Sequence, residues 1–152
     1  MAKVGQLEIK TQEQVIQLFT EDLGYRYLGD WKERDGNANI ETEILTSWLK
    51  ECGHDNGVIE KVIRKLNQAS AITGSQSLYD SNKEVYRLLR YGVKVTPDIG
   101  ENNITVSLVD WENPEANDFA IAEEVTIHGR NTKRPDLVLY VNGIALGVIE
   151  LK

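Results

Sequence analysis

The chain has 152 residues and a formal net charge of −7, with 41% hydrophobic and 27% charged residues. These are ordinary values for a globular protein and exclude the disordered and fibrous classes, and the length is sufficient to bury about two thirds of the unfolded surface. No apolar run approaches the roughly 20 residues of a membrane span and the N-terminus lacks the apolar core of a secretory signal, so we expect a cytoplasmic protein without membrane contact.

The first 92 residues show helical periodicity in several places. The spacing of Thr11 and Gln14 predicts a capping box at the start of the first helix, and Ser81 with Glu84 predicts another at the start of the last. The polar segment 25–39 is typical of a loop with a short strand. The expected helices are residues 12–23, 40–51, 58–68 and 81–92. The single Cys52 within this region cannot form an internal disulfide, and we expect a buried or inert thiol.

After residue 100 the pattern changes to that of strands. Alternation at 104–109 and 119–127 predicts strands with one buried face. The runs Leu137–Val141 and Ile144–Leu151 are apolar on successive residues, which indicates cover on both faces. Helices first and strands last favour an α+β or mixed α/β fold, with a largely antiparallel or mixed sheet flanked by helices.

The charge of the chain is unevenly distributed. Residues 101–124 contain seven Asp and Glu and no Lys or Arg, so the remainder of the chain is balanced. A net negative charge is the wrong sign for a protein that holds nucleic acid by itself. Arg130, Lys133 and Arg134 form a short basic patch directly before Asp136, which is either a solvated loop or a set of phosphate contacts.

The last hairpin has three charged residues at its open end: Asp136 before the first strand, and Glu150 and Lys152 at the end of the second. Glu150 and Lys152 share a face because they are two apart. A two-residue Asn142-Gly143 turn would put Asp136 on the other face, whereas a three-residue loop of residues 141–143 with a glycine bulge would put it diagonal to Glu150. We expect the three-residue loop on chemical grounds, although a bulge elsewhere in either strand would give the same convergence.

Two ionised carboxylates within about 4 to 5 Å of each other repel by roughly 3 to 4 kcal/mol at an effective dielectric constant of 20. Asp136 and Glu150 would therefore need a raised pKa or a bound divalent cation, and their oxygen ligands suit Mg²⁺. Lys152 could contact the same phosphate or the attacking water. This set of groups predicts phosphodiester hydrolysis, while charges at a strand end are also typical of a solvated terminus.

The segments RPD, LVLYVNG and VIELK within residues 134–152 resemble the signature of the PD-(D/E)xK nuclease superfamily. The form is that of the N-terminal region of the restriction and motor (R) subunit of type I restriction-modification enzymes. NKEVYRLLRYGVKV (82–95), VSLVDWENPEANDF (106–119) and the Glu13 helix ending at Gly24-Tyr25 resemble the same region in order and spacing. The family usually has proline where this hairpin has Ala145.

This resemblance implies a restriction-endonuclease-like core in which Asp136 and Glu150 bind the metal and Lys152 is the catalytic lysine. Glu13 would complete the metal site, or would only complement the dipole of its helix. Residues 1–152 would form a single nuclease domain, an N-terminal fragment of a larger subunit whose remainder, beyond Lys152, includes a helix with a Gln-Tyr motif and the ATP-driven motor.

The substrate that the resemblance implies is double-stranded DNA, cleaved without sequence preference, and the partners are methyltransferase and specificity subunits. In such a complex the acidic stretch 101–124 is expected to face away from DNA or towards a partner. Two alternatives remain: a repair or junction nuclease of the same superfamily, and a docking module that keeps the nuclease fold but is inactive in isolation.

Overall fold

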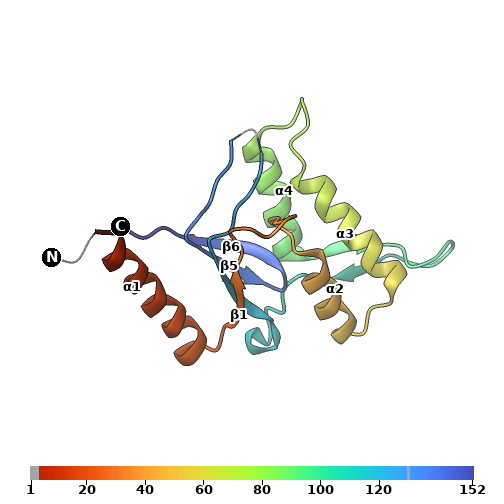
Figure 1. The fold of residues 1–152 in the computed structure, drawn as a ribbon. Coiled ribbons are helices and arrows are strands. Elements are labelled where there is room, and N and C mark those ends of the chain that lie inside the picture. Colours follow the sequence, from red (N-terminus) through yellow and green to blue (C-terminus); the bar gives the residue numbers. More distant parts are fainter. Residues whose placement is uncertain (1–3, 130) are drawn as a thin grey trace. The chain divides into compact units, whose positions relative to one another are not determined.

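The computed structural model describes residues 4–129 and 131–152 and divides into two compact units (Figure 1). Unit 1 joins the N-terminal part of the chain, up to Glu41, to the C-terminal part, from Asp118 onwards; unit 2 is the continuous segment Thr42–Asn117. The helices and mixed sheets of the described residues form the expected α+β fold. The single-domain organisation stays a prediction.

Unit 1 is a four-stranded sheet with one long helix. Helix α1 (Val4–Gln17) continues into a π-helical turn, η1 (Leu18–Asp22). The strands are β1 (Arg26–Asp30), β4 (Phe119–Glu123), β5 (Leu137–Val141) and β6 (Ile144–Ile149). Their order in the sheet is β1-β4-β5-β6, in which β1 and β4 are parallel and the other pairs antiparallel. A parallel pair needs a crossover connection, and here that connection is residues 31–118, which include the whole sequence of unit 2.

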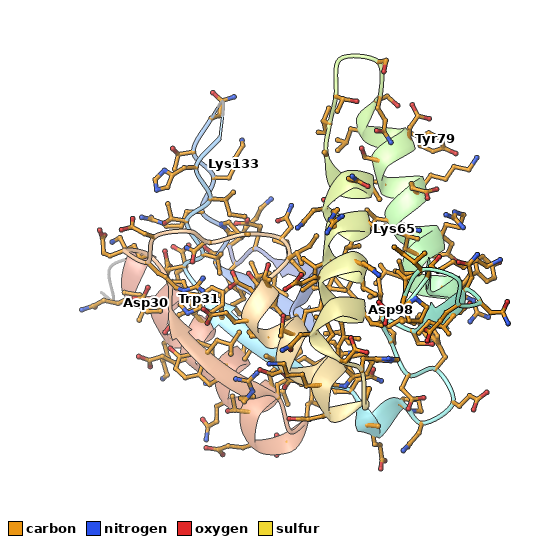
Figure 2. The ribbon with its side chains drawn as sticks, turned by 90° about the vertical axis from the view of Figure 1, so that its right-hand side faces the viewer. Asp30, Trp31, Lys65, Tyr79, Asp98 and Lys133 are labelled. Atoms are coloured by element: carbon orange, nitrogen blue, oxygen red, sulfur yellow. The ribbon has the colours of Figure 1, made fainter. Side chains whose placement is uncertain are left out.

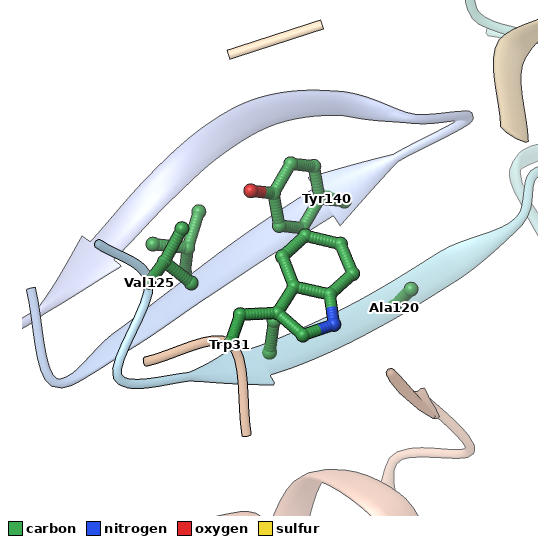
Figure 3. Close-up of a cluster of buried hydrophobic side chains, with 6 residues drawn as sticks. Trp31, Ala120, Val125 and Tyr140 are labelled. Atoms are coloured by element: carbon green, nitrogen blue, oxygen red, sulfur yellow. The ribbon is translucent and has the colours of Figure 1, made fainter. Parts of the chain in front are cut away.

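One face of this sheet carries a hydrophobic cluster (Figure 3). The rings of Trp31 and Tyr140 lie 5.6 Å apart, centroid to centroid. The Arg34 guanidinium covers Trp31 at 4.0 Å and forms an ion pair with the buried Glu41 at 2.8 Å, so the polar edge of the cluster is neutralised. Alternate residues of β4 and β5 supply the cluster because strand side chains alternate between faces. Its members are Trp31, Ala120, Ala122, Val125, Val138 and Tyr140.

Unit 2 is built from three helices and a small hairpin. It contains α2 (Thr42–Glu51), α3 (Asn56–Ser70), α4 (Leu78–Tyr91), the antiparallel strands β2 (Val93–Val95) and β3 (Ile104–Val106), and the 3-10 turn η2 (Pro114–Ala116). Fully buried aliphatic residues form its core, each stabilising the fold by about 1.5 to 3 kcal/mol. They include Leu45, Leu49, Val62, Leu66, Val93, Val106 and Leu108. No helix of the described residues could cross a membrane.

Both capping boxes predicted from the sequence are misplaced. Thr11 lies inside α1, where its hydroxyl donates to the Leu7 carbonyl at 2.9 Å. Helix α4 is capped by Ser77 and Asp80, which exchange the two reciprocal hydrogen bonds of a capping box. Ser81 is buried one turn later. Each helix therefore begins at least one turn before the predicted start.

The prediction of cover on both faces is wrong for β6. Leu146 and Val148 are 49% and 61% exposed, because β6 is the edge strand of the described sheet. Strand β5 lies between β4 and β6, and its residues Leu137, Val138 and Tyr140 are buried. Only the inner strand of the hairpin has the environment that its apolar run indicates.

Candidate active site

The turn of the β5–β6 hairpin has two residues instead of three. Val141 pairs with Ile144, and Asn142 and Gly143 between them have φ values of 52° and 83°, as a type I′ turn requires. Asn142 is buried; its Oδ1 accepts from the Asp118 backbone nitrogen at 2.7 Å, and its own backbone nitrogen donates to the Asp118 carbonyl at 2.8 Å. The expected three-residue loop is therefore wrong, because hydrogen bonds to the start of β4 hold Asn142 in the tight turn.

A bulge in β6 compensates for the shorter turn. Tyr140 pairs with Ala145, but the preceding residue of β5, Leu139, pairs with Gly147. Leu146 is consequently an extra residue on β6, and the pairing beyond it is shifted by one. A bulge in either strand was the alternative route to convergence of the charged groups, and the hairpin has one.

The register beyond the bulge leads to two carboxylates at the open end of the hairpin. The last pair of the hairpin joins Leu137 to Ile149, and Asp136 and Glu150 are the residues that adjoin this pair on the two strands. Asp136 is half-buried, and its Oδ2 accepts a hydrogen bond from the Leu151 backbone nitrogen at 2.6 Å. Glu150 is exposed. Opposed residues of antiparallel strands have Cβ atoms about 4.5 to 5.5 Å apart, so a register continued by one residue would let both side chains reach one ligand.

The donor set at the mouth of the hairpin fits a hard divalent cation. Asp136 and Glu150 offer carboxylate oxygens, which Mg²⁺ prefers, and the exposed Lys152 follows two residues after Glu150. Within the described part of the chain, no three His, Cys, Asp or Glu side chains gather into a metal-binding group. Magnesium binding and the ligand role of Glu13 stay predictions.

Glu13 lines a cleft of about 720 Å³ in unit 1. The walls come from α1, η1, β1, the end of β4 and the residues beside them. Acidic residues outnumber basic ones in this lining, so its electrostatic potential favours a cation over a phosphate. The acidic members are Glu13, Glu21, Asp30, Glu123 and Glu124, and the basic members are Lys32 and Arg134.

Two hydrogen bonds that the sequence did not reveal hold Glu123 in this cleft. The Tyr27 hydroxyl donates to one carboxylate oxygen, and the Gln12 side-chain amide donates to the other at 2.8 Å. Burial, followed by the hydrogen bond to Glu123, raises the pKa of Tyr27 to about 12, so Tyr27 remains a donor at neutral pH. The next residue, Glu124, donates its backbone N–H to the Asp136 carbonyl at 2.8 Å. The network thereby adjoins the segment that carries Asp136.

The three cations predicted to contact DNA differ in their surroundings. Arg130 lies outside the described residues. Lys133 is exposed on the loop before β5 (Figure 2), where its backbone forms two hydrogen bonds with Ile127 at 2.8 and 3.0 Å. Arg134 forms an ion pair with Glu124 at 2.9 Å, which reduces the positive charge that it offers to a phosphate. Their role as DNA contacts stays a prediction.

The acidic stretch 101–124 is divided between the two units, and its members in unit 1 have local partners. Asp118 forms an ion pair with Arg26 at 2.6 Å, and Glu124 forms one with Arg134. Glu123 accepts the hydrogen bonds described above. These carboxylates therefore help to hold unit 1 together, and the orientation of the stretch towards a partner or away from DNA stays a prediction.

Cys52 in unit 2 is exposed instead of buried. Desolvation raises the pKa of its thiol, and the carboxylates of Asp110 and Glu51 raise it further. Because the thiolate is the nucleophilic form, this cysteine is a poor nucleophile at neutral pH.

The fold is consistent with a restriction-endonuclease-like core. It has a mixed sheet with helices, an aspartate directly before β5, and a Glu-x-Lys sequence at the end of the antiparallel strand β6. The family model described as "Type I restriction enzyme R protein N terminus" matches residues 5–152. This chain therefore belongs to that family.

Two curated relatives are each 33% identical to this chain over 137 residues. One is the "Putative type I restriction enzyme MjaVIIIP endonuclease subunit" of Methanocaldococcus jannaschii, where the match covers 80% of this chain and 12% of the relative. The other is the "Type I restriction enzyme HindI endonuclease subunit" of Haemophilus influenzae, with 84% and 13% covered. The chain thus spans about an eighth of the length of these relatives. No solved structure matches it.

Proposed function

We propose that this chain is the Mg²⁺-dependent endonuclease domain of a type I restriction complex and that it cleaves double-stranded DNA without sequence preference. Family membership and the positions of Asp136 and Glu150, each next to the last pair of the hairpin, support this function. ATP would be used by motor domains elsewhere in the complex, and methyltransferase and specificity subunits would select the DNA. The mouth of the β5–β6 hairpin is the proposed catalytic centre.

Asp136, Glu150 and Lys152 have distinct roles in this proposal. The hydrogen bond from Leu151 fixes one oxygen of Asp136 and leaves the other available to a ligand. Asp136 and Glu150 would hold Mg²⁺, which when bound supplies a polarised water and neutralises charge on the phosphate. Lys152 would donate a hydrogen bond to the attacking water or to a non-bridging phosphate oxygen, where negative charge develops.

The same geometry predicts that the cation stabilises the fold. A cation held by both carboxylates would relieve the repulsion between the ionised side chains of Asp136 and Glu150, which the exposure of Glu150 screens in part. Asp136→Asn should therefore raise the unfolding midpoint in the absence of metal. It should also abolish the rise that Mg²⁺ or Mn²⁺ gives the wild-type chain.

The activity is tested in the full-length subunit within its complex. Asp136→Ala, Glu150→Ala and Lys152→Ala should each abolish DNA cleavage while ATP hydrolysis continues. Cleavage at the wild-type rate by any of the three variants would contradict its assigned role. Loss of ATP hydrolysis together with cleavage would instead indicate a damaged subunit.

Metal binding is tested on the 152-residue chain by titration with Mn²⁺, followed by electron paramagnetic resonance. Asp136→Asn and Glu150→Gln should weaken binding strongly. Glu13→Gln tests the third ligand, with Glu8→Gln, an exposed residue of the same helix, as the control for a general loss of negative charge. Unchanged affinity in both Asp136→Asn and Glu150→Gln would rule out the proposed centre.

A further inference from the structure

The outer face of α4 combines aromatic and basic side chains. Tyr79, Lys83, Tyr86 and Arg90 follow one another at intervals of four, three and four residues, which places them in one stripe along the helix. Tyr79 and Tyr86 are 72% and 65% exposed, and Figure 2 shows Tyr79 on the side of α4 away from α3. The buried residues of α4 are Ser81 and Leu88, on the opposite face. The stripe is therefore not required for the core of unit 2.

This stripe lies within the most basic part of the chain. Residues 61–94 contain seven Lys and Arg against two Asp and Glu, a net charge of +5 in a chain of −7. Both acidic residues are engaged within α4: Asp80 in the cap with Ser77, and Glu84 in an ion pair with Arg87 at 2.6 Å. Among the described residues, neither Lys83 nor Arg90 forms a salt bridge, and Lys83 has a coulombic attraction to Asp80 that, after the hydrogen bonds from Ser77, helps to lower the pKa of that carboxyl.

The C-terminal end of the stripe is extended by a tryptophan from a later segment. The Trp111 indole N–H donates to the Leu89 carbonyl at 3.0 Å, yet the side chain is 53% exposed. The Arg90 guanidinium lies 5.5 Å from the Trp111 ring centroid and 6.0 Å from that of Tyr91. Aromatic rings and cations thus alternate along the surface, and the last ring is held in place by a hydrogen bond.

We propose that this face of α4 binds single-stranded DNA, with Tyr79 and Tyr86 stacking on bases and Lys83 and Arg90 contacting phosphates. Exposed rings interleaved with cations are the arrangement by which proteins hold unpaired strands without reading their sequence. At a rise of 1.5 Å per residue, the two rings are about 10 Å apart along the helix axis, and so are the two cations. A duplex would offer the phosphates but not the base faces.

This binding face deepens the proposed function and depends on it only for the identity of the nucleic acid as DNA. It belongs to unit 2, whereas Asp136 and Glu150 belong to unit 1. An unpaired strand held on unit 2 would be a second DNA contact of the nuclease domain. It would also explain how a chain of net charge −7 can bind DNA at all.

The test uses the full 152-residue chain and fluorescence anisotropy of a labelled 15-nucleotide thymidine oligomer, without divalent metal. Tyr79→Leu combined with Tyr86→Leu should weaken binding at least tenfold, whereas Tyr79→Phe with Tyr86→Phe should stay within twofold, because the ring and not the hydroxyl stacks. Equal affinity of the leucine and phenylalanine variants would overturn the stacking role. Unchanged thermal midpoints would show that each variant is folded.

The cations are tested by salt dependence. Lys83→Gln with Arg90→Gln should weaken binding and reduce the slope of log K against log salt concentration by about 1.4, or 0.7 per lost phosphate contact. Arg64→Gln, an exposed arginine on α3 within the same basic segment, is the matched control and should change little. A loss of affinity and slope in Arg64→Gln equal to that of the double variant would overturn the assignment.

Two further measurements separate this inference from the proposed catalytic function. Asp136→Ala should bind the oligomer as the wild type does while losing Mn²⁺, which would support both proposals. If all α4 variants bind the oligomer as tightly as the wild type does, the strand-binding face is overturned and a protein is left as the partner of this surface. That result would not affect the catalytic proposal. A 15-base-pair duplex that binds as tightly as the single strand would also overturn it.

Discussion

Replacing Asn142 in the β5–β6 turn by alanine should destabilise the fold by about 2 to 3 kcal/mol. The side chain is fully buried and accepts a hydrogen bond from the Asp118 backbone nitrogen at 2.7 Å. Losing the acceptor leaves that donor unsatisfied, which costs about 1 to 3 kcal/mol for a buried group, and we take the lower half because Asp118 is only half-buried. The φ of 52° adds about 1 kcal/mol, since alanine tolerates the left-handed region less well than asparagine.

Two further variants separate these contributions in urea unfolding. Asn142→Gly loses the hydrogen bond but accepts the positive φ, so it should be about 1 kcal/mol less destabilising than Asn142→Ala. Asn142→Asp keeps an acceptor and should lie closest to the wild type. Equal destabilisation by alanine and glycine would show that the backbone conformation carries no cost. A loss below about 0.5 kcal/mol for alanine would refute the role of Asn142 in fixing the turn.

Three other substitutions test separate features. Gly92 has a φ of 80°, and Gly92→Ala would place a Cβ 2.9 Å from the Val106 carbonyl oxygen, so it should reduce stability in urea unfolding by about 2 to 4 kcal/mol. Gly100→Ala is the control, because Gly100 has a similar φ but open space around it, and it should cost about 1 to 2 kcal/mol. Equal losses in the two variants would contradict the clash at Gly92. Tyr27 has a folded pKa of about 12 against about 10 unfolded, so its stabilising contribution is complete below pH 10 and is lost as the pH rises to 12. The free energy of unfolding of Tyr27→Phe, measured by denaturation at each pH, should therefore fall less between pH 10 and pH 12 than that of the wild type. An identical pH profile in the two proteins would contradict this role of Tyr27. Tyr140→Phe removes a buried hydroxyl that has no partner among the described residues and should raise the thermal midpoint or leave it unchanged, whereas a marked drop would show that the hydroxyl is satisfied.

Strand β5 was predicted to the residue, and its neighbours show why other features were not. The run Leu137–Val141 lies between a Pro-Asp step and an Asn-Gly turn, so local signals mark both ends. The bulge at Leu146 has no such signal, because both faces of β6 are apolar in sequence and either register buries similar side chains. Strand β1 is polar and short, and its parallel pairing with β4 depends on contacts that no local pattern records.

The candidate site shows the same division between local and distant information. Asp136, Glu150 and Lys152 stand out because they are charged residues at the ends of apolar runs: Asp136 precedes one run, and Glu150 and Lys152 lie at the end of the other. Gln12 and Tyr27, which hold Glu123, lie 111 and 96 residues away from it in sequence. Glu123 and Glu124 lie within the alternation at 119–127, which predicted a strand but neither its end at Glu123 nor the partners of these carboxylates. Contacts over such separations come from the topology of the sheet.

The parallel pairing of β1 with β4 also sets an order for biosynthesis. About 90 residues separate the two strands in the chain, and at 5 to 20 residues per second a ribosome needs roughly 5 to 20 s to make them. Unit 2 is continuous and is made in full during that interval, whereas β1 has no sheet partner until β4 follows. Helix α1 and strand β1 are therefore made several seconds before the strand that pairs with β1.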